Sequence, residues 1–197
     1  MALAVRAARP GDEAAVAEVH VRSWQEAYKE LMPAEFLAAL DPRERAARYE
    51  FGGGEEAPTT LVAVEVGEEG SGVTPSLTNS VEVRSGVTPD PVERAPLVGF
   101  VTFGSSRDED ARGLAEIYAL YVDPERYGGG VGRLLMAEAR GRLAELGFEA
   151  AVLWVLRGNE RARSFYRREG WSPDGTSRVE QPYGIVSTVD RFRRDLP

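Results

Sequence analysis

The stretch YVDPERYGGGVGRLL, residues 121–135, decides the fold. It joins an apolar segment, residues 114–122, to a segment with the apolar spacing of a helix. A strand that turns through glycines into a helix is an arrangement that binds phosphates, because N–H groups point outward at a helix N-terminus and the helix dipole adds positive potential. Four of the five residues at 128–132 are glycines, which let the backbone approach an anion closely.

Two standard phosphate loops do not match this pattern. A dinucleotide fingerprint needs glycines at relative positions one, three and six, and the sixth position is Arg133 counted from Gly128 or Leu135 counted from Gly130. A P-loop needs Gly-Lys before Ser or Thr, and the single lysine, Lys29, lies far away in the sequence. By elimination, we expect a pyrophosphate-binding loop of a different type. A plain glycine-rich turn is the alternative.

Outward from the loop, apolar periodicity and turn residues predict alternating strands and helices on one mixed sheet, an α/β or α+β class. The expected strands are residues 3–8, 60–66, 97–103, 114–122 and 150–156 and two more within 171–196. The expected helices are a pattern ending near Tyr28, then 34–40, 42–49, the helix after the loop, and 159–169.

Two of these elements have faces that can be predicted. In the helix after the loop, one apolar face is formed by Val131, Leu135, Ala139, Leu143 and Leu146. The strand at 114–122 should alternate strictly, with the side chains from Glu116 to Val122 at even positions on one face and those from Ala115 to Tyr121 at odd positions on the other.

Residues 67–96 are rich in Gly, Ser, Thr and Pro, and the sequence SGVTP occurs twice, at 71–75 and 85–89. Such a segment does not pack a core, so we expect a mobile insertion or an extended arm within one domain spanning residues 1–197. A lid or partner-binding loop is the functional alternative.

Composition excludes several chemistries. The chain has no cysteine and a single histidine, His20, so disulfides, thiolate metal sites, a cysteine nucleophile and clusters of several histidines are excluded. His20 is expected at the surface or in a hydrogen-bonded structural position. The net charge of -8 disfavours nucleic acid and would favour a cationic acceptor, although it also serves simple solubility. With no long apolar run and no signal-peptide pattern, we expect a cytoplasmic protein without a membrane partner.

A second motif, NERARSFYRREGW at 159–171, joins the glycine loop. In this order the two motifs resemble the GNAT superfamily of N-acetyltransferases, whose coenzyme-A loop has Arg or Gln followed by x-x-Gly-x-Gly/Ala and whose second signature is Asn-x-x-Ala-x-x-Phe-Tyr-x-x-x-Gly-Phe. This chain departs at Tyr127, which stands in place of the Arg or Gln, and at Trp171, which replaces the Phe. Arg126 lies one residue before the expected position.

The resemblance implies a mixed, mostly antiparallel sheet flanked by helices and splayed open between the central parallel strands at residues 114–122 and 150–156, with acetyl-CoA as co-substrate in the gap and no metal. The coenzyme contacts that it implies or that the loop predicts are Leu120, Tyr121, Val122, Tyr127, Gly128, Gly129, Gly130, Val131, Gly132, Arg133, Asn159 and Tyr166.

Tyr166 is the predicted catalytic acid. Asn159 and Tyr166 lie seven residues apart, so two helical turns place them on one face. A phenol can donate a proton to the departing thiolate, and the resemblance implies the same role. We expect Phe165 to fill the core while Tyr166 faces the coenzyme, and a packed aromatic is the alternative for Tyr166.

Glu116 is the predicted catalytic base, because it lies in an otherwise apolar strand, where burial would raise the pKa of a carboxylate toward a working range. The resemblance also implies a glutamate at this position in some members of the family. Two alternatives stay open: Glu116 pairs with an arginine, or the amine loses its proton through water.

Trp24 and Tyr28 are four residues apart and share a helix face, so they line the acceptor pocket or pack in the core. Without cysteine, we expect direct attack of a primary amine, on a small molecule or a peptide, on acetyl-CoA in a ternary complex. A coenzyme-A-binding sensor or interaction module without catalysis is the alternative function. Members of the family are often dimers, which leaves a homodimer open.

Overall fold

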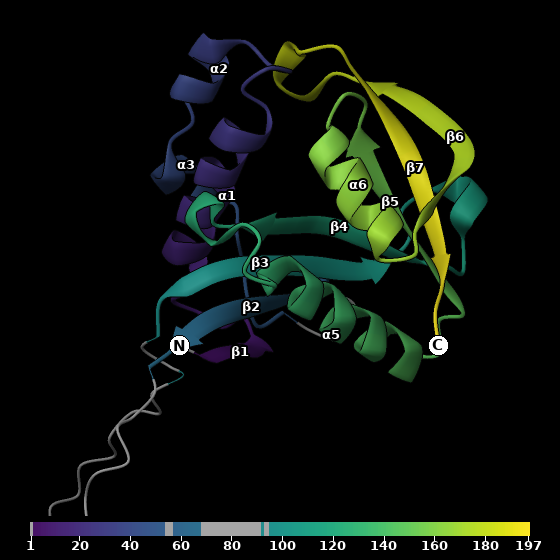
Figure 1. The fold of residues 1–197 in the computed structure, drawn as a ribbon, viewed down its shortest axis with the longest axis horizontal. Helices are drawn as coiled ribbons and strands as arrows, with labels where there is room; N and C mark the ends of the chain where they lie inside the picture. Colours follow the sequence, from purple (N-terminus) through teal and green to yellow (C-terminus); the bar gives the residue numbers. More distant parts are fainter. Residues whose placement is uncertain (1, 54–56, 68–91, 93–94) are drawn as a thin grey trace, which may run out of the picture.

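The computed structural model describes residues 2–53, 57–67, 92 and 95–197. Within them the chain builds a seven-stranded sheet in the order β1-β2-β3-β4-β5-β7-β6 (Figure 1). The pairs are antiparallel except for β4 and β5, which run parallel. The strands are β1 (Ala2–Ala7), β2 (Thr59–Val66), β3 (Leu97–Ser105), β4 (Ala115–Val122), β5 (Ala150–Leu156), β6 (Ser172–Glu180) and β7 (Ser187–Asp195).

The helices also fall where the sequence predicts them. They are α1 (Glu13–Ala27), α2 (Ala34–Ala38), α3 (Pro42–Ala46), α5 (Val131–Glu145) and α6 (Glu160–Arg168), with short 3₁₀ turns η1 (Glu109–Ala111), η2 (Pro124–Arg126) and η3 (Pro182–Gly184). The helices predicted at 34–40 and 42–49 are shorter than expected. Most of the segment at 67–96 lies outside the described residues.

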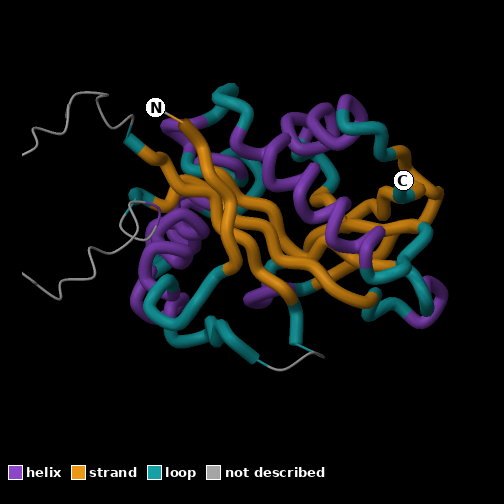
Figure 2. Tube along the Cα trace, turned by 90° about the horizontal axis from the view of Figure 1, so that it is seen from below, coloured by secondary structure: helices purple, strands orange, loops and turns teal. Residues whose placement is uncertain are grey.

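The sheet lies between helices on its two faces (Figure 2). Strand β2 shows why: Leu61 and Ala63 pack in one buried cluster with the inner face of α5, whereas Val62 and Val64 pack in another with α1. Alternate residues of a strand point to opposite faces, so the apolar run at residues 61–64 of β2 must be covered on both sides.

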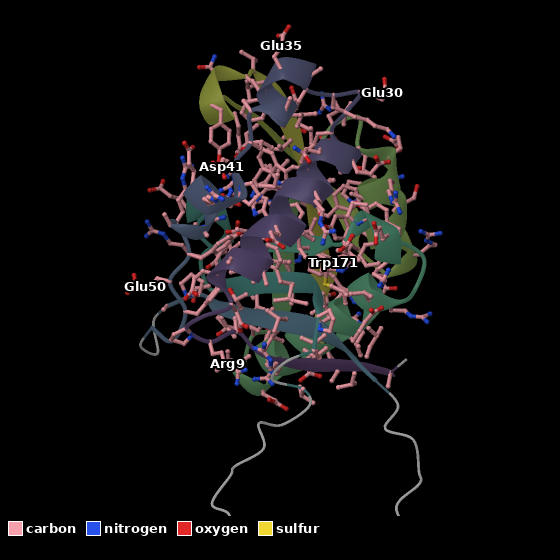
Figure 3. The ribbon with its side chains drawn as sticks, turned by 90° about the vertical axis from the view of Figure 1, so that its left-hand side faces the viewer. Arg9, Glu30, Glu35, Asp41, Glu50 and Trp171 are labelled. Carbon is pink, nitrogen blue, oxygen red and sulfur yellow. The ribbon has the colours of Figure 1, made fainter. Side chains whose placement is uncertain are left out.

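The side of the molecule that carries α1, α2 and α3 is seen in Figure 3. The acidic side chains of Glu30, Glu35, Asp41 and Glu50 are exposed around these helices. Trp171, in contrast, is buried with only 2% of its surface exposed, and it joins the core cluster beneath α5. Trp171, the last residue of the second motif, therefore has a packing role.

The predicted inner face of α5 is correct at four of its five positions and wrong at the fifth. Val131, Leu135, Ala139 and Leu143 are buried, but Leu146 is 68% exposed. The helix ends at Glu145, so Leu146 is its C-cap and lies beyond the regular spacing. Phe148 packs against the core there instead.

Strand β4 contains a bulge that the strict alternation did not predict. Thr102 and Phe103 of β3 pair with Ala119 and Ile117, so Tyr118 is an extra residue on β4. Ile117, before the bulge, therefore packs in the same core cluster as Leu120, after it. An extra residue moves all later side chains to the opposite face, which is why the predicted faces are wrong across Tyr118.

Strands β4 and β5 separate next to this bulge. Their parallel pairing covers only Ala115, Glu116 and Ile117, opposite Ala151 to Leu153. Beyond Ile117, β4 stays paired with β3 alone, so its backbone toward β5 is no longer engaged in the sheet. The predicted splay is therefore present, and it exposes backbone groups of residues 118–122 to the gap.

Candidate coenzyme and acceptor site

The glycine loop leads into the start of α5 with a left-handed backbone. Gly128 has φ +81° and Gly130 has φ +85°, a region that L-residues with side chains rarely adopt. A Cβ added at either glycine would meet no atom within 4 Å, so the space in front of the loop is open.

The first turn of α5 has no side-chain cap. The N–H of Leu134 makes the first bond of the helix, to the carbonyl oxygen of Gly130 at 3.0 Å, so the N–H groups of residues 131–133 precede its first acceptor. An uncapped helix start with open space before it fits the pyrophosphate of a coenzyme.

Two side chains of α1 hold the segment that joins β4 to the glycine loop by hydrogen bonds. Asp123 is buried, and its carboxylate accepts hydrogen bonds from the Glu125 N–H at 3.1 Å and from Arg22 Nη2 at 2.5 Å. Ser23 Oγ donates to the Val122 carbonyl at 2.6 Å. These bonds hold the end of β4 and the loop in place before any ligand arrives.

A cavity of about 620 Å³ occupies the splay between β4 and β5. It brings together nearly all the predicted coenzyme contacts, with Gly129 as the exception. The predicted residues that line it are Leu120, Tyr121, Val122, Tyr127, Gly128, Gly130, Val131, Gly132, Arg133, Asn159 and Tyr166.

Asn159 begins α6 as its N-cap. Its side-chain carbonyl oxygen accepts a hydrogen bond from the Ala162 N–H at 3.1 Å, and the residue is buried. This bond satisfies one of the free donors of the helix start. The oxygen is thus committed to the helix, and the amide NH₂ group is the part of this side chain that can serve a ligand.

Tyr166 lies half-buried at the wall of the cavity. Burial, with a smaller effect from the neighbouring Tyr121, raises the pKa of its phenol well above the usual value, so the hydroxyl stays protonated. Phe165, expected in the core alone, packs on the core and also lines the same cavity.

A second cavity of about 500 Å³ adjoins the first. Its lining includes Trp24 and Glu116, and it shares with the first cavity Tyr28, Ile117, Tyr118, Trp154 and Leu156. The two residues predicted for the acceptor and the predicted base therefore lie around one space.

Glu116 is only 2% exposed and is held by Arg107. The Arg107 N–H reaches Oε2 at 3.0 Å, and its Nη2 reaches Oε1 at 2.7 Å. Glu116 thus pairs with an arginine, as one alternative from the sequence proposed. It also lies at the wall of the second cavity.

Sequence reasoning missed Arg107 and Trp154 as residues of this site. Trp154 Nε1 donates to Asp108 at 2.8 Å, and the Arg178 guanidinium covers its ring at 3.9 Å. A tryptophan near the end of the strand beside the splay was a usable signal for Trp154. No pattern in the sequence identified Arg107, which lies in the turn between β3 and β4.

His20 is buried, which rules out a surface position. Its Nδ1 lies 2.5 Å from the Tyr49 hydroxyl, and its ring stacks on Tyr121 with centroids 4.5 Å apart. Burial, with help from Arg45, lowers the pKa of the imidazole to about 3, so it is neutral. His20 therefore supports Tyr121 from behind the cavity.

Metal-binding clusters and membrane-spanning helices are both absent from the described part of the chain. No group of three or more His, Cys, Asp or Glu side chains is placed there to hold a metal ion. Among the described helices, none combines the length and the apolar character that crossing a bilayer requires.

Comparisons with known proteins agree with this geometry. The family model described as "Acetyltransferase (GNAT) family" matches residues 87–171, a range that contains β4, the glycine loop and the second motif. This chain is thus similar to the GNAT acetyltransferases over residues 87–171.

The individual similarities cover different shares of this chain. The uncharacterized N-acetyltransferase YuaI of Bacillus subtilis is 28% identical over 79% of this chain and 72% of its own length. A mycothiol acetyltransferase of Propionibacterium freudenreichii is 44% identical, but the match covers 53% of this chain and only 33% of that enzyme. The solved structure of the PaiA N-acetyltransferase from Thermoplasma acidophilum in complex with coenzyme A has a TM-score of 0.62 at 18% identity, over 99% of both chains, and shares the fold.

Proposed function

We propose that this protein transfers the acetyl group of acetyl-CoA to a primary amine on a small molecule or peptide by direct attack in a ternary complex. One observation carries the proposal: two cavities meet at the splay of β4 and β5 and share five lining residues, which are Tyr28, Ile117, Tyr118, Trp154 and Leu156. One cavity begins at the uncapped glycine loop, and the other contains a buried carboxylate and aromatic walls.

In this proposal the coenzyme lies in the larger cavity. The N–H groups at the start of α5 hold its pyrophosphate, and Arg133 adds positive charge. The backbone groups of β4 at 118–122 that β5 does not pair lie along the pantetheine arm of the coenzyme. Acetyl-CoA supplies an acetyl group already activated as a thioester, so the protein has to contribute positioning and proton transfer.

Tyr166 is the proposed acid. Its phenol lines the coenzyme cavity and stays protonated because burial raises its pKa. A protonated hydroxyl at this wall can give its hydrogen to the sulfur as the carbon–sulfur bond breaks.

Glu116 is the proposed acceptor of the amine proton. Among the carboxylates that line the second cavity, it is the one buried in the sheet itself. Its bonds to Arg107 fix the carboxylate beside that cavity, and a water between the amine and Glu116 would complete the path.

Trp24 and Tyr28 are the proposed acceptor-side residues. Tyr28 is half-buried, and the burial of its phenol, with the nearby phenols of Tyr121 and Tyr166, raises its pKa. Tyr28 thus lies where the two cavities meet, in a position to orient the amine toward the thioester.

The test is thiol release from acetyl-CoA with a panel of amines that includes spermidine, aminoglycosides, free amino acids and short peptides. We expect amine-dependent release of free coenzyme A, matched by the acetylated amine. Tight binding of coenzyme A with no turnover on any amine would instead support the rival function, a sensor or interaction module.

A further inference from the structure

Tyr127 stands just before the glycines of the loop, and the structure contains an arginine that lies on the ring of this tyrosine. The guanidinium carbon of Arg161 lies 3.4 Å from the centre of the Tyr127 ring. Arg161 comes from the first turn of α6, two residues after the N-cap Asn159. A guanidinium that stacks on an aromatic face keeps its N–H donors free at its edge.

The arginine inside the loop is already engaged elsewhere. Arg126 Nε and Nη2 donate to the two carboxylate oxygens of Glu65 on β2, at 2.6 and 3.0 Å. This two-pronged pair holds the loop against the sheet. Arg126 therefore cannot bind a phosphate in the cavity without breaking its pair with Glu65.

Arg161 differs from its neighbours in its lack of an acidic partner. Arg163, on the same helix, pairs with Asp190 at 2.6 Å, and Arg157, just before it, pairs with Asp190 at 2.5 Å. Across the described residues, the contact of Arg161 is the Tyr127 ring, with neither an ion pair nor a hydrogen bond to its guanidinium. Its side chain also lines the same cavity as the glycine loop.

We propose that Arg161, held on the ring of Tyr127, binds a phosphate group of the coenzyme beside the glycine loop. The inference rests on the proposed function, because it assumes that the larger cavity takes coenzyme A. In this arrangement the ring of Tyr127 positions the guanidinium of Arg161, which comes from the start of α6.

The experiment measures coenzyme A affinity by calorimetry for the wild type, Arg161→Met, Tyr127→Ala and the double variant. Loss of one charged hydrogen bond should weaken binding about tenfold in each single variant. The double variant should bind no more weakly than Arg161→Met, because both changes remove the same contact. Tyr127→Phe keeps the ring and should lose much less affinity than Tyr127→Ala.

Arg167→Met is the matched control, since Arg167 lies on the same helix but does not line the cavity. It should keep wild-type affinity. Repeating the titrations with 3′-dephospho-CoA and with pantetheine identifies the phosphate. A loss that persists with dephospho-CoA indicates the pyrophosphate, and a loss seen only with coenzyme A indicates the 3′-phosphate.

Two results would overturn the inference while leaving the proposed function intact. One is wild-type coenzyme A affinity in Arg161→Met. The other is an equal loss for pantetheine, which has no pyrophosphate and no 3′-phosphate and would report a structural effect. Failure of the wild type itself to bind coenzyme A would instead contradict the proposed function.

Discussion

Helices α5 and α6 both begin at the edge of the same cavity, and they begin in opposite ways. The start of α5 follows two left-handed glycines and has no side-chain cap. The start of α6 is closed by Asn159, whose side chain accepts the Ala162 N–H. One helix thus leaves its first backbone donors for a ligand, and the other satisfies a donor from within the chain.

This difference separates two tasks. The loop at α5 offers backbone N–H groups in open space, which suits an anion whatever the surrounding side chains are. Helix α6 offers side chains instead, since Arg161, Phe165 and Tyr166 all line the cavity. We therefore expect changes at α5 to act on coenzyme affinity and changes at Tyr166 to act on turnover.

The largest effect is expected from Tyr166→Phe. Removing the hydroxyl takes away the proposed acid, and turnover should fall at least about 100-fold. Coenzyme A affinity should stay within about twofold of the wild type, because the backbone grip at α5 is unchanged. Thiol-release kinetics and calorimetry measure the two quantities.

The pH dependence of turnover tests the role of Tyr166 in a second way. Because burial raises its pKa, the phenol keeps its proton above the ordinary tyrosine value of about 10. The wild type should therefore lose no activity through Tyr166 as the pH rises to about 10. Unchanged turnover in Tyr166→Phe would remove this residue from the mechanism.

The next largest effect is expected at the start of α5. Gly130→Val forces a β-branched residue into a backbone with φ +85°, at a cost of about 1–3 kcal/mol in unfolding free energy. The displaced N–H groups should also weaken coenzyme A binding by about tenfold or more. Thermal unfolding and calorimetry report both changes.

Gly141→Ala is the matched control within α5. Gly141 lies in the middle of the helix, and an added Cβ there meets no atom within 4 Å. This variant should gain about 0.5–1 kcal/mol of unfolding free energy. Its coenzyme A affinity should not change, and a loss comparable to that of Gly130→Val would contradict the role given to the loop.

The smallest effect is expected at the cap of α6. Asn159→Ala removes the side-chain acceptor and should lower the unfolding free energy by about 1 kcal/mol. Asn159→Asp keeps an acceptor and should keep the stability, while it removes the NH₂ donor that the coenzyme arm would use. Weaker coenzyme binding in Asn159→Asp without loss of stability would separate the two roles of this residue, and full binding in both variants would limit Asn159 to capping.

The sequence predicted what depends on local chemistry. The glycines at 128–132 and the apolar face from Val131 to Leu143 depend on backbone freedom and helical spacing, and both can be recognised within a short window. The order of strands around the splay came from the resemblance, not from the periodicity. The parallel pair of β4 and β5 is present as expected.

The rest depends on contacts between distant segments. The bulge at Tyr118 appears only when β4 is paired with β3, and it moves the later side chains of β4 to the other face. The engagement of Arg126 by Glu65 joins residues 61 positions apart. Neither feature leaves a periodic trace in the sequence, so neither could be predicted from it.

The most direct test of the account follows backbone amide resonances by NMR while coenzyme A is added. The account predicts large shifts at the N–H groups of Gly130, Val131 and Gly132, where α5 begins without a side-chain cap. The N–H of Gly141, which lies in the middle of α5 and does not line the cavity, should shift little. Saturated binding with unchanged signals at the start of α5 would contradict the central claim that the glycine loop grips the coenzyme through its backbone.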